Sequence, residues 1–469
     1  MLNTDMTMME ALADAVKHRR QQEAIVCREE RLTYGDLSEQ VSRLAHGLYS
    51  DLGIRKGDKV ATLLHPGAPF ACVFFSLAQI GAVIVPLNPR LRPRALTEQL
   101  RHAEPAAIVT SLSIQDDIIQ EVGVLRHVIH VRGENGGLSL AGLMANDGTC
   151  PSIALSPADL MALLYTSGTT GSPKATMHSH RSLITPVAAT LRVRQLWRSP
   201  RARMLGKQIK VLARYRERLL RAAGRPQRFL STIPWHTISG VEAMLQALLM
   251  GDTLVVMPHF HPRRALELVE QERATILIAV PLAYQVMLRV EGFERYDTSS
   301  LIVCGTGAAP CRPQLAREME TRFGCAVHIG FGSTETAGGI AVTNLDDCQA
   351  ERTETVGRPL SGMEVKVVDE QRQELPPGEV GELACRSDSV MIGYYRNPDM
   401  TSEVTDEHGW YYTGDLAAMD ERGYLRIVGR KKDMIIRGGE AVYPAEIETY
   451  LVAHSKIREA AVAGIPADL

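Results

Sequence analysis

The stretch LLYTSGTTGSPKATMHSH, residues 163–180, joins an apolar run to a cluster of serine, threonine and glycine and then to a single lysine, Lys174. We expect LMALLY, residues 160–165, to form a buried strand. In the loop after it, glycines let backbone N–H groups converge, hydroxyls add donors and Lys174 adds a positive charge. These groups suit a polyphosphate, although the spacing differs from the P-loop pattern. The alternative is a flexible Ser/Gly linker. A linker seldom runs directly from an apolar strand into KATMHSH, so the stretch favours a phosphate-binding loop.

The composition is that of an ordinary globular protein. The chain has 469 residues, 45% hydrophobic and 23% charged, enough for more than one core. A net charge of −2 argues against electrostatic binding of nucleic acid by the whole molecule, and none is expected as a partner. The eight cysteines form no CxxC pair, so we expect reduced, mostly buried thiols of a cytosolic protein rather than disulfides or a zinc site.

The uncharged stretch at residues 60–89 invites a membrane interpretation. Prolines and glycines divide it into pieces too short to span a bilayer of about 30 Å. We predict a strand at 60–64, a buried helix at 69–79 and a strand at 82–86. The N-terminus lacks the basic and apolar regions of a secretory signal. The sequence therefore predicts a cytoplasmic α/β protein.

Strand-like and helix-like runs alternate through about the first three hundred residues. AAIVTS, DTLVVM, TILIAV and LIVCGT are strand-like, and EAMLQALLM and PRRALELVEQ are helix-like. The alternation predicts parallel sheets with helices on their faces. After about Gly357, GMEVKVVDE, GELACRS, GYLRIVGR and DMIIRGG indicate a small β-rich unit.

A basic segment covers residues 192–228 and holds thirteen Lys or Arg against one acidic residue, Glu217. Apolar residues recur within it at helical spacing. A basic amphipathic helix can lie on an anionic membrane, dock a protein or nucleic acid, or cover part of the core with its cationic side chains in solvent. The pattern favours the surface helix and keeps peripheral membrane association as an alternative.

Three later stretches carry polar groups suited to a nucleotide. Glu335 in GFGSTETAGG follows a Gly/Ser/Thr turn, and a carboxylate beside phosphate donors is a natural Mg²⁺ ligand. Asp415 in WYYTGDLAAMD can accept hydrogen bonds from both ribose hydroxyls. GYLRIVGRKKDMIIRGGEAVYPAEIE joins a strand to a cationic turn and a glycine pair.

In this order and spacing, YTSGTTGSPK, GFGSTE, YYTGD and GRKKDMIIRGGEAVYPAEIE resemble the AMP-forming adenylating superfamily, which includes acyl-CoA synthetases, peptide-synthetase adenylation domains and beetle luciferases. The resemblance runs from about residue 31 to the end. It implies a large N-terminal AMP-binding domain, residues 1–430, of stacked α/β sheets plus a β-barrel-like subdomain. A small mobile α+β C-terminal domain would begin at residues 431–469.

The resemblance also implies roles for individual residues. The first loop and Lys174 would hold the β- and γ-phosphates, Thr334 the α-phosphate, Glu335 the Mg²⁺, and Asp415 and Arg430 the ribose. Phe331 stands where the family usually has a tyrosine against adenine. The full implied ATP/AMP-binding set is Thr166, Ser167, Gly168, Thr169, Thr170, Gly171, Lys174, Gly307, Ala308, Ala309, Phe331, Gly332, Ser333, Thr334, Asp415 and Arg430.

Four more positions follow from the resemblance. His236 in PWHTISG matches a residue at the mouth of the acyl pocket, with a packed core histidine as the alternative. Lys432 marks the hinge of the C-terminal domain, with a plain surface charge as the alternative. Gly438 and Gly439 would approach the pantetheine arm. The implied catalytic set is Lys174, Thr334, Glu335 and His236.

The family's C-terminal domain continues beyond the position of Leu469 to a Gly-Lys motif that assists adenylation. The resemblance therefore implies weak adenylation by this C-terminally short chain. A strand at REAAVAGI, residues 458–465, would have an open edge.

The resemblance implies an acid–CoA ligase that uses ATP, Mg²⁺ and CoA. PWHTISG lacks the aspartate that pairs with a substrate ammonium, which favours a hydrophobic, fatty or related acid. The alternatives are an acyl-AMP ligase that loads a carrier protein, and a catalytically impaired protein that only binds nucleotide or acyl-adenylate.

Overall fold

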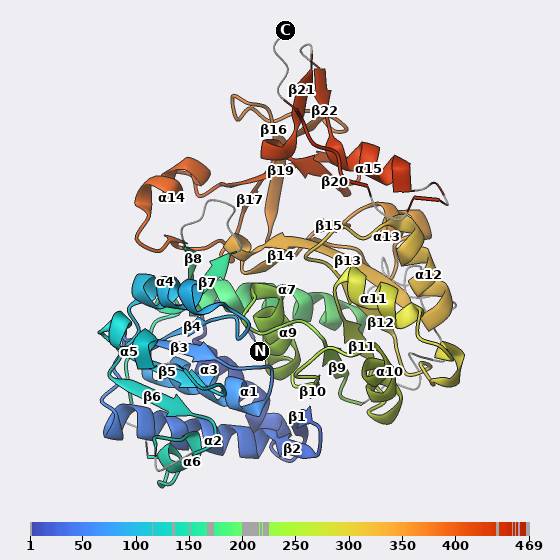
Figure 1. The fold of residues 1–469 in the computed structure, drawn as a ribbon. Coiled ribbons are helices and arrows are strands. Elements are labelled where there is room, and N and C mark those ends of the chain that lie inside the picture. The colour runs from blue at the N-terminus through green and yellow to red at the C-terminus, as the bar shows by residue number, and fades with distance from the viewer. Residues whose placement is uncertain are drawn as a thin grey trace.

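The chain forms two large sheets with helices between and around them, and a smaller β-rich part after them (Figure 1). The structure is a computed structural model. It describes residues 2–114, 116–133, 137–149, 152–166, 173–198, 215, 218, 225–437, 440–452, 454, 456–457 and 460–465. The predicted α/β class is confirmed.

The first large sheet has seven strands in the order β18-β8-β7-β4-β3-β5-β6. Its inner strands run parallel, whereas β7, β8 and β18 pair in antiparallel fashion at one edge. The strand bounds are β3 Lys59–Leu63, β4 Val83–Pro86, β5 Ala107–Thr110, β6 His127–His130, β7 Leu160–Thr166, β8 Lys174–Ser179 and β18 Gly393–Tyr394. β3 and β4, with the helix α3 between them, confirm the buried α/β unit predicted for the uncharged stretch.

The second large sheet has nine strands in the order β15-β14-β13-β12-β11-β9-β10-β1-β2. The six strands from β13 to β1 in this order run parallel, and antiparallel strands lie at both edges. The bounds are β1 Glu23–Cys27, β2 Glu30–Thr33, β9 Arg228–Ser231, β10 Thr253–Val256, β11 Ile276–Ile278, β12 Val303–Thr306, β13 Ala326–Ser333, β14 Gly338–Val342 and β15 Arg358–Pro359. The predicted parallel pairing is confirmed.

The helices cover both faces of these sheets. Their bounds are α1 Met8–Arg19, α2 Tyr34–His46, α3 Ala68–Ile80, α4 Pro93–Ala103, α5 Asp116–Val122, α6 Leu140–Leu143, α7 His180–Arg198, α9 Ile238–Leu249, α10 Pro262–Gln271, α11 Pro281–Leu288, α12 Pro313–Phe323, α13 Gln349–Glu354, α14 Pro398–Val404 and α15 Pro444–Val452. Short turns η1 Gly47–Asp51, η3 Phe293–Arg295, η4 Thr334–Thr336 and η5 Lys431–Asp433 link them. None of the described helices is long and apolar enough to cross a membrane.

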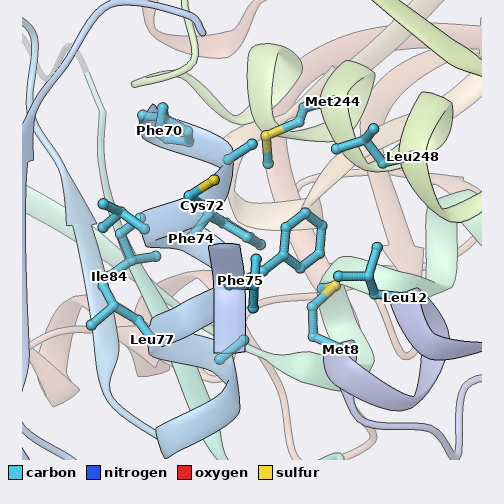
Figure 2. Packing of buried hydrophobic residues seen from close by; sticks show 14 of the residues in the cluster. Met8, Leu12, Phe70, Cys72, Phe74, Phe75, Leu77, Ile84, Met244 and Leu248 are labelled. Atoms are coloured by element: carbon cyan, nitrogen blue, oxygen red, sulfur yellow. The ribbon is translucent and has the colours of Figure 1, made fainter. Parts of the chain in front are cut away.

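The main hydrophobic core lies between the two large sheets. Figure 2 shows Phe74 and Phe75 of α3 beside Met8 and Leu12 of α1 and Met244 of α9. This helix layer also packs against inward-facing residues of both sheets, so it joins them into one body. α3 starts with Pro69 in its first turn and ends at Gly81 in the left-handed conformation, φ +71°. Proline and glycine at its two ends thus limit α3 to a short buried helix, as predicted for the uncharged stretch.

The β-rich part is a four-stranded antiparallel sheet in the order β16-β17-β19-β20, followed by a two-stranded sheet. The bounds are β16 Glu364–Val368, β17 Val380–Arg386, β19 Tyr411–Met419, β20 Leu425–Arg430, β21 Ile435–Arg437 and β22 Glu440–Val442. The strand expected at 458–465 is wrong for the described residues 460–465. These residues are not in a sheet, and Ile465 is exposed.

The basic segment is described only in part, and most of it lies outside the described residues. Its first seven residues continue α7, and Arg194 of this helix forms a salt bridge with the buried Asp252 at 2.5 Å. Tyr215 is buried, and the Arg218 guanidinium donates to the carbonyl oxygens of Thr298, Leu301 and Phe323. At these positions the segment contacts the core, but Arg194 and Arg218 are paired with protein groups, whereas the surface-helix interpretation placed the cationic side chains in solvent.

The seven described cysteines are free thiols, as the sequence predicts. Cys304 and Cys325 lie on β12 and immediately before β13, with their sulfur atoms 3.3 Å apart. Burial raises the pKa of the Cys304 thiol well above its usual value. Cys150 lies outside the described residues.

Candidate functional site

The opening stretch of the sequence folds into the antiparallel hairpin β7–β8. Thr166 at the end of β7 pairs directly with Lys174 at the start of β8, so the hairpin ends face each other. Ser167, Gly168, Thr169, Thr170 and Gly171 of the predicted loop lie outside the described residues. The hairpin lies at the edge of the seven-stranded sheet that faces the β-rich part of the molecule (Figure 1).

Lys174 and Glu335 meet at this edge, although 161 positions separate them in the chain. Glu335 lies in η4, the turn that connects β13 to β14. Lys174 Nζ is 3.5 Å from Glu335 Oε1, and both side chains are mostly buried. Thr334 occupies the first position of the same turn. The structure therefore brings together the lysine, the threonine and the carboxylate that the sequence assigned to one site.

Tyr394, to which the sequence analysis assigned no role, completes this cluster. Its hydroxyl donates to Glu335 Oε1 at 2.8 Å, and Lys174 Nζ lies 3.9 Å from the centre of its ring. Burial and the negative charge of Glu335 raise the pKa of Tyr394 far above its usual range, so the phenol keeps its proton. Its position in β18, hydrogen-bonded to β8, places it beside Lys174.

Asp415 and Arg430 form a second polar group on the four-stranded sheet. They are direct partners across β19 and β20, and Arg430 Nε donates to Asp415 Oδ1 at 3.1 Å. Burial raises the pKa of Asp415, and the Arg430 charge opposes this rise; the negative charge of Glu335 also raises it.

The predicted adenine-side residues lie where β12 and β13 end. Gly307 follows β12, and a side chain there would come within 2.7 Å of the Gly330 carbonyl oxygen. Ala308 has φ +62°, an uncommon conformation for a residue with a side chain. Phe331 and Gly332 lie in β13, and Ser333 ends the strand. Ala309 completes the loop after Gly307. The close approach at Gly307 therefore holds the backbone after β12 against Gly330 of β13.

His236 precedes α9 and is half-buried beside the fully buried Trp235. Burial, together with smaller electrostatic effects of Arg90 and His65, lowers its pKa to about 4. The ring is therefore neutral near pH 7. His65 follows β3 and Arg90 follows β4, both in the seven-stranded sheet, whereas His236 itself follows β9 of the nine-stranded sheet.

Two ionisable residues near the site, the buried His178 and the partly buried Glu242, were missed by the sequence analysis. His178 of β8 is buried next to the Thr334 backbone, and burial lowers its pKa to about 4. Glu242 of α9 lies against Gly338 and Gly339, and burial raises its pKa to about 7. His178 belongs to the opening motif, which offered a signal. Glu242 stands alone in an apolar helix.

The predicted hinge residue Lys432 lies in η5, directly after β20, and its side chain is exposed. Its neighbour Lys431 donates from Nζ to Glu382 at 2.9 Å. Gly438 and Gly439 lie outside the described residues.

Comparison with known proteins supports a common family for the chain and its relatives. The family model described as AMP-binding enzyme matches residues 12–395. A medium-chain fatty-acid–CoA ligase of Escherichia coli (strain K12) is 33% identical over 451 residues, which cover 92% of this chain and 73% of that enzyme. A feruloyl-CoA synthase of an Amycolatopsis species is 33% identical over 437 residues, covering 93% and 81%.

Among solved structures, an anthranilate CoA ligase in complex with anthranoyl-AMP superposes with a TM-score of 0.85. The match covers 99% of this chain and 86% of that one at 24% sequence identity, and it supports the same fold.

Proposed function

Because the chain belongs to the AMP-binding enzymes and is an AMP-forming acyl-CoA synthetase, we propose that its substrate is a hydrophobic carboxylic acid. The acid would react with ATP to give an acyl-adenylate and pyrophosphate, and CoA would then displace AMP. The proposal rests above all on the meeting of Lys174 with Glu335 at 3.5 Å, beside Thr334. This arrangement provides cationic and hydroxyl donors together with one carboxylate ligand.

The first half-reaction needs positioning and charge neutralisation more than proton transfer. The substrate carboxylate is itself the nucleophile, so the protein need not supply a general base. Lys174 would neutralise charge on the departing pyrophosphate, and Thr334 would donate to the α-phosphate. Such preorganised donors are the largest single contribution in many enzymes.

Mg²⁺ fits the donor set at Glu335. This ion is commonly held by one or two carboxylates together with substrate phosphates. Among the described residues, the hydrogen bond and the ion pair made by the Glu335 carboxylate both meet Oε1. The second oxygen, Oε2, could therefore serve as a ligand. When bound, the ion would supply further charge neutralisation at the phosphates.

The nucleoside would lie between the two large sheets' loops and the four-stranded sheet. Asp415 is 7% exposed and faces the solvent-accessible Arg430, so it could accept hydrogen bonds from ribose hydroxyls. Phe331 would offer a ring face to adenine without the hydroxyl of a tyrosine. Gly307, Ala308 and Ala309 would approach the base closely because their side chains are absent or small.

The acid would lie near His236. PWHTISG has no acidic residue to pair with a substrate ammonium, and the buried Trp235 makes the surroundings apolar. The named relatives include a medium-chain fatty-acid ligase and a feruloyl-CoA synthase, so fatty and aromatic acids are the first candidates. We assign Lys432 to the hinge of the C-terminal part on its position directly after β20.

The test is an acid panel with ATP, Mg²⁺ and CoA, in which pyrophosphate, AMP and acyl-CoA are measured. We expect acid-dependent release of both products, with hydrophobic acids preferred over amino acids and short hydrophilic acids. Absence of acid-dependent pyrophosphate would contradict the proposal. Thioester formed only on a carrier-protein phosphopantetheine would favour the carrier-protein alternative. ATP binding without turnover, and without thioester from synthetic acyl-AMP plus CoA, would favour an impaired binding protein.

Residues 192–228 support a weaker, separate proposal of peripheral contact between a cytoplasmic enzyme and an anionic membrane. The support is the excess of cations in this segment. Salt-sensitive binding to anionic vesicles, with none to neutral vesicles, is expected. Equal binding to both would contradict it.

A further inference from the structure

A cluster of three side chains, Lys174, Glu335 and Tyr394, joins strands β8 and β18 to the turn η4. The Tyr394 hydroxyl donates to Glu335 Oε1 at 2.8 Å, and Lys174 Nζ lies 3.5 Å from the same oxygen. The ammonium also lies over the Tyr394 ring, 3.9 Å from its centre. Each of the three therefore contacts the other two.

Tyr394 is the fixed member of this cluster. The residue is 3% exposed and packs in a hydrophobic cluster with Ile340, Met363, Cys385, Met391 and Tyr411. Its backbone N–H donates to Thr401 Oγ1 at 2.9 Å, and its strand pairs with β8 at Thr176. A buried phenol hydroxyl needs a partner, and a charged acceptor gives the stronger hydrogen bond. The hydroxyl therefore defines where one oxygen of Glu335 must lie.

The backbone of Glu335 is held from the same region. Its carbonyl oxygen accepts from the Met391 N–H at 2.7 Å, three residues before Tyr394. The segment 391–394 thus forms hydrogen bonds with both the main chain and the side chain of Glu335. Rotation of the carboxylate would break the phenol hydrogen bond, so the direction of Oε2 is set as well.

Lys174 and a divalent cation would compete for the same carboxylate. The lysine neutralises Glu335 when no other cation is close, and the Tyr394 ring adds a cation–π contribution. A Mg²⁺ ion bound with ATP would take over the neutralisation of Glu335. Lys174 could then turn toward the phosphates, whose negative charge exceeds that of one carboxylate.

From this geometry we propose that Tyr394 is a positioning residue: it holds Glu335 Oε1 so that Oε2 meets Mg²⁺, and it retains Lys174 beside Glu335 until Mg²⁺·ATP replaces it. The inference rests on the proposed adenylation, because it assigns the metal contact to Glu335. It adds a residue for which the motifs of the nucleotide site gave no signal.

The test replaces Tyr394 by Phe, which keeps the ring and its packing but removes the hydroxyl. The matched control is Tyr395→Phe, the next residue, whose ring contacts His102 and Arg396 instead of the cluster. Acid-dependent pyrophosphate release is measured over a range of Mg²⁺ concentrations at fixed ATP. ATP binding is measured by calorimetry with and without Mg²⁺, which gives a readout independent of turnover.

In Tyr394→Phe we expect the Mg²⁺ concentration for half-maximal rate to rise about tenfold, as loss of a hydrogen bond to a charged group predicts. The KM for the acid should change less than about twofold, because the Tyr394 hydroxyl contacts Glu335, which is assigned to the metal and not to the acid. The gain in ATP affinity on adding Mg²⁺ should shrink by a similar factor, while ATP affinity without Mg²⁺ stays near the wild-type value. Tyr395→Phe should match the wild type in all four quantities.

An unchanged Mg²⁺ dependence in an active Tyr394→Phe enzyme would overturn the inference. So would a uniform loss of rate with unchanged Mg²⁺ and ATP binding, because that result indicates a structural role only. Failure of the proposed function looks different: the wild-type protein itself would then show no acid-dependent release of pyrophosphate. In that case the Mg²⁺-dependent part of ATP binding still decides whether Tyr394 acts on Glu335.

Discussion

Asp415 and Arg430 are direct partners on the adjacent strands β19 and β20. The Asp415 carboxylate is buried, and the Arg430 guanidinium is exposed. The Asp415 side chain is 10% exposed and that of Arg430 is 61% exposed, with 3.1 Å between Oδ1 and Nε. Burial raises the pKa of Asp415, and Arg430 opposes the rise. Arg430 thus favours the ionised form of Asp415, which is the form that the proposed ribose contact requires.

Replacing Arg430 by Gln should move the acidic limb of ATP binding to higher pH. In the proposed site the ionised carboxylate accepts hydrogen bonds from the ribose, so we expect binding to weaken as the pH falls through the Asp415 pKa. Removing the guanidinium raises this pKa further, and the upward movement of the limb is modest because solvent screens Arg430. The KM for ATP is measured across the acidic and neutral pH range.

Asp415→Asn serves as the control for this experiment. This variant should bind ATP weakly at every pH, and its KM for ATP should not rise further as the pH falls. An Arg430→Gln enzyme with a raised KM but an unmoved limb would show that Arg430 contacts the nucleotide without tuning Asp415.

Replacing Lys174 by Met should lower kcat/KM for ATP by about 10²–10³-fold, the usual loss when one preorganised donor is removed from developing charge. The folded state should tolerate the change, since the lysine is partly exposed and its ion pair is long at 3.5 Å. Steady-state pyrophosphate release and thermal melting separate the two effects.

Lys56→Met provides a matched lysine for the Lys174 experiment. Lys56 pairs with Asp159 at 2.6 Å, away from the nucleotide residues. It should leave kcat/KM unchanged. Equal losses in the two variants would contradict a catalytic role for Lys174.

Much of the site could be predicted because its residues lie in short motifs. Glu335 lies in the turn that follows β13, and Lys174 begins β8 after a Gly/Ser/Thr-rich stretch. Asp415 follows Thr413 and Gly414 within the antiparallel strand β19, and it was recognised from its short motif rather than from the end of a strand. Tyr394 could not be predicted in this way, because its contact with Glu335 spans 59 positions and depends on the pairing of β18 with β8.

The fold of most of the chain could also be predicted from local sequence patterns. The structure near residue 465 was harder to predict. Alternating strands and helices with proline and glycine boundaries specified the two parallel sheets. The apolar residues at 460–465 satisfy the pattern of a strand, yet a strand forms only when a partner supplies its hydrogen bonds. Glu242 was missed because one acidic residue in an apolar helix carries no periodic signal.

The rate of pyrophosphate release should show no change caused by protonation of His236 near the usual pKa of a histidine. Its pKa is lowered to about 4, mainly by burial, so the ring stays neutral through the neutral pH range. His236→Phe keeps an aromatic ring, and we expect an unchanged KM for ATP with a KM for the acid altered about 3- to 10-fold. The acid and ATP dependences of pyrophosphate release check this.

His236→Ala distinguishes a pocket residue from a packing residue. A larger change in the KM for the acid, with the melting temperature kept, supports the pocket role. A large fall in melting temperature with unchanged acid dependence would support the core-histidine alternative instead.

Glu242→Gln should stabilise the protein at alkaline pH and have little effect at acidic pH. Burial raises the folded-state pKa of Glu242 to about 7 from its ordinary value of 4.5. The folded state therefore holds this proton more tightly than the unfolded state, and stability declines as the pH rises from 4.5 to about 7. Glutamine has a similar shape and no charge, so it avoids the decline. The expected gain above neutral pH is about 1–3 kcal/mol.

Thermal melting at one pH near 5.5 and one near 8, roughly either side of the usual neutral range, tests this sign directly. The exposed Glu379→Gln is the control and should shift the melting temperature equally little at both values. The Gln246 side chain donates to Glu242 Oε1 at 3.1 Å, and it keeps an acceptor in the variant because the introduced amide oxygen replaces a carboxylate oxygen. A Glu242→Gln protein that is destabilised equally at both pH values would show that the ionised carboxylate is required there. The expected stabilisation would then be absent, because the variant loses a charge-assisted hydrogen bond between the carboxylate and the Gly339 backbone.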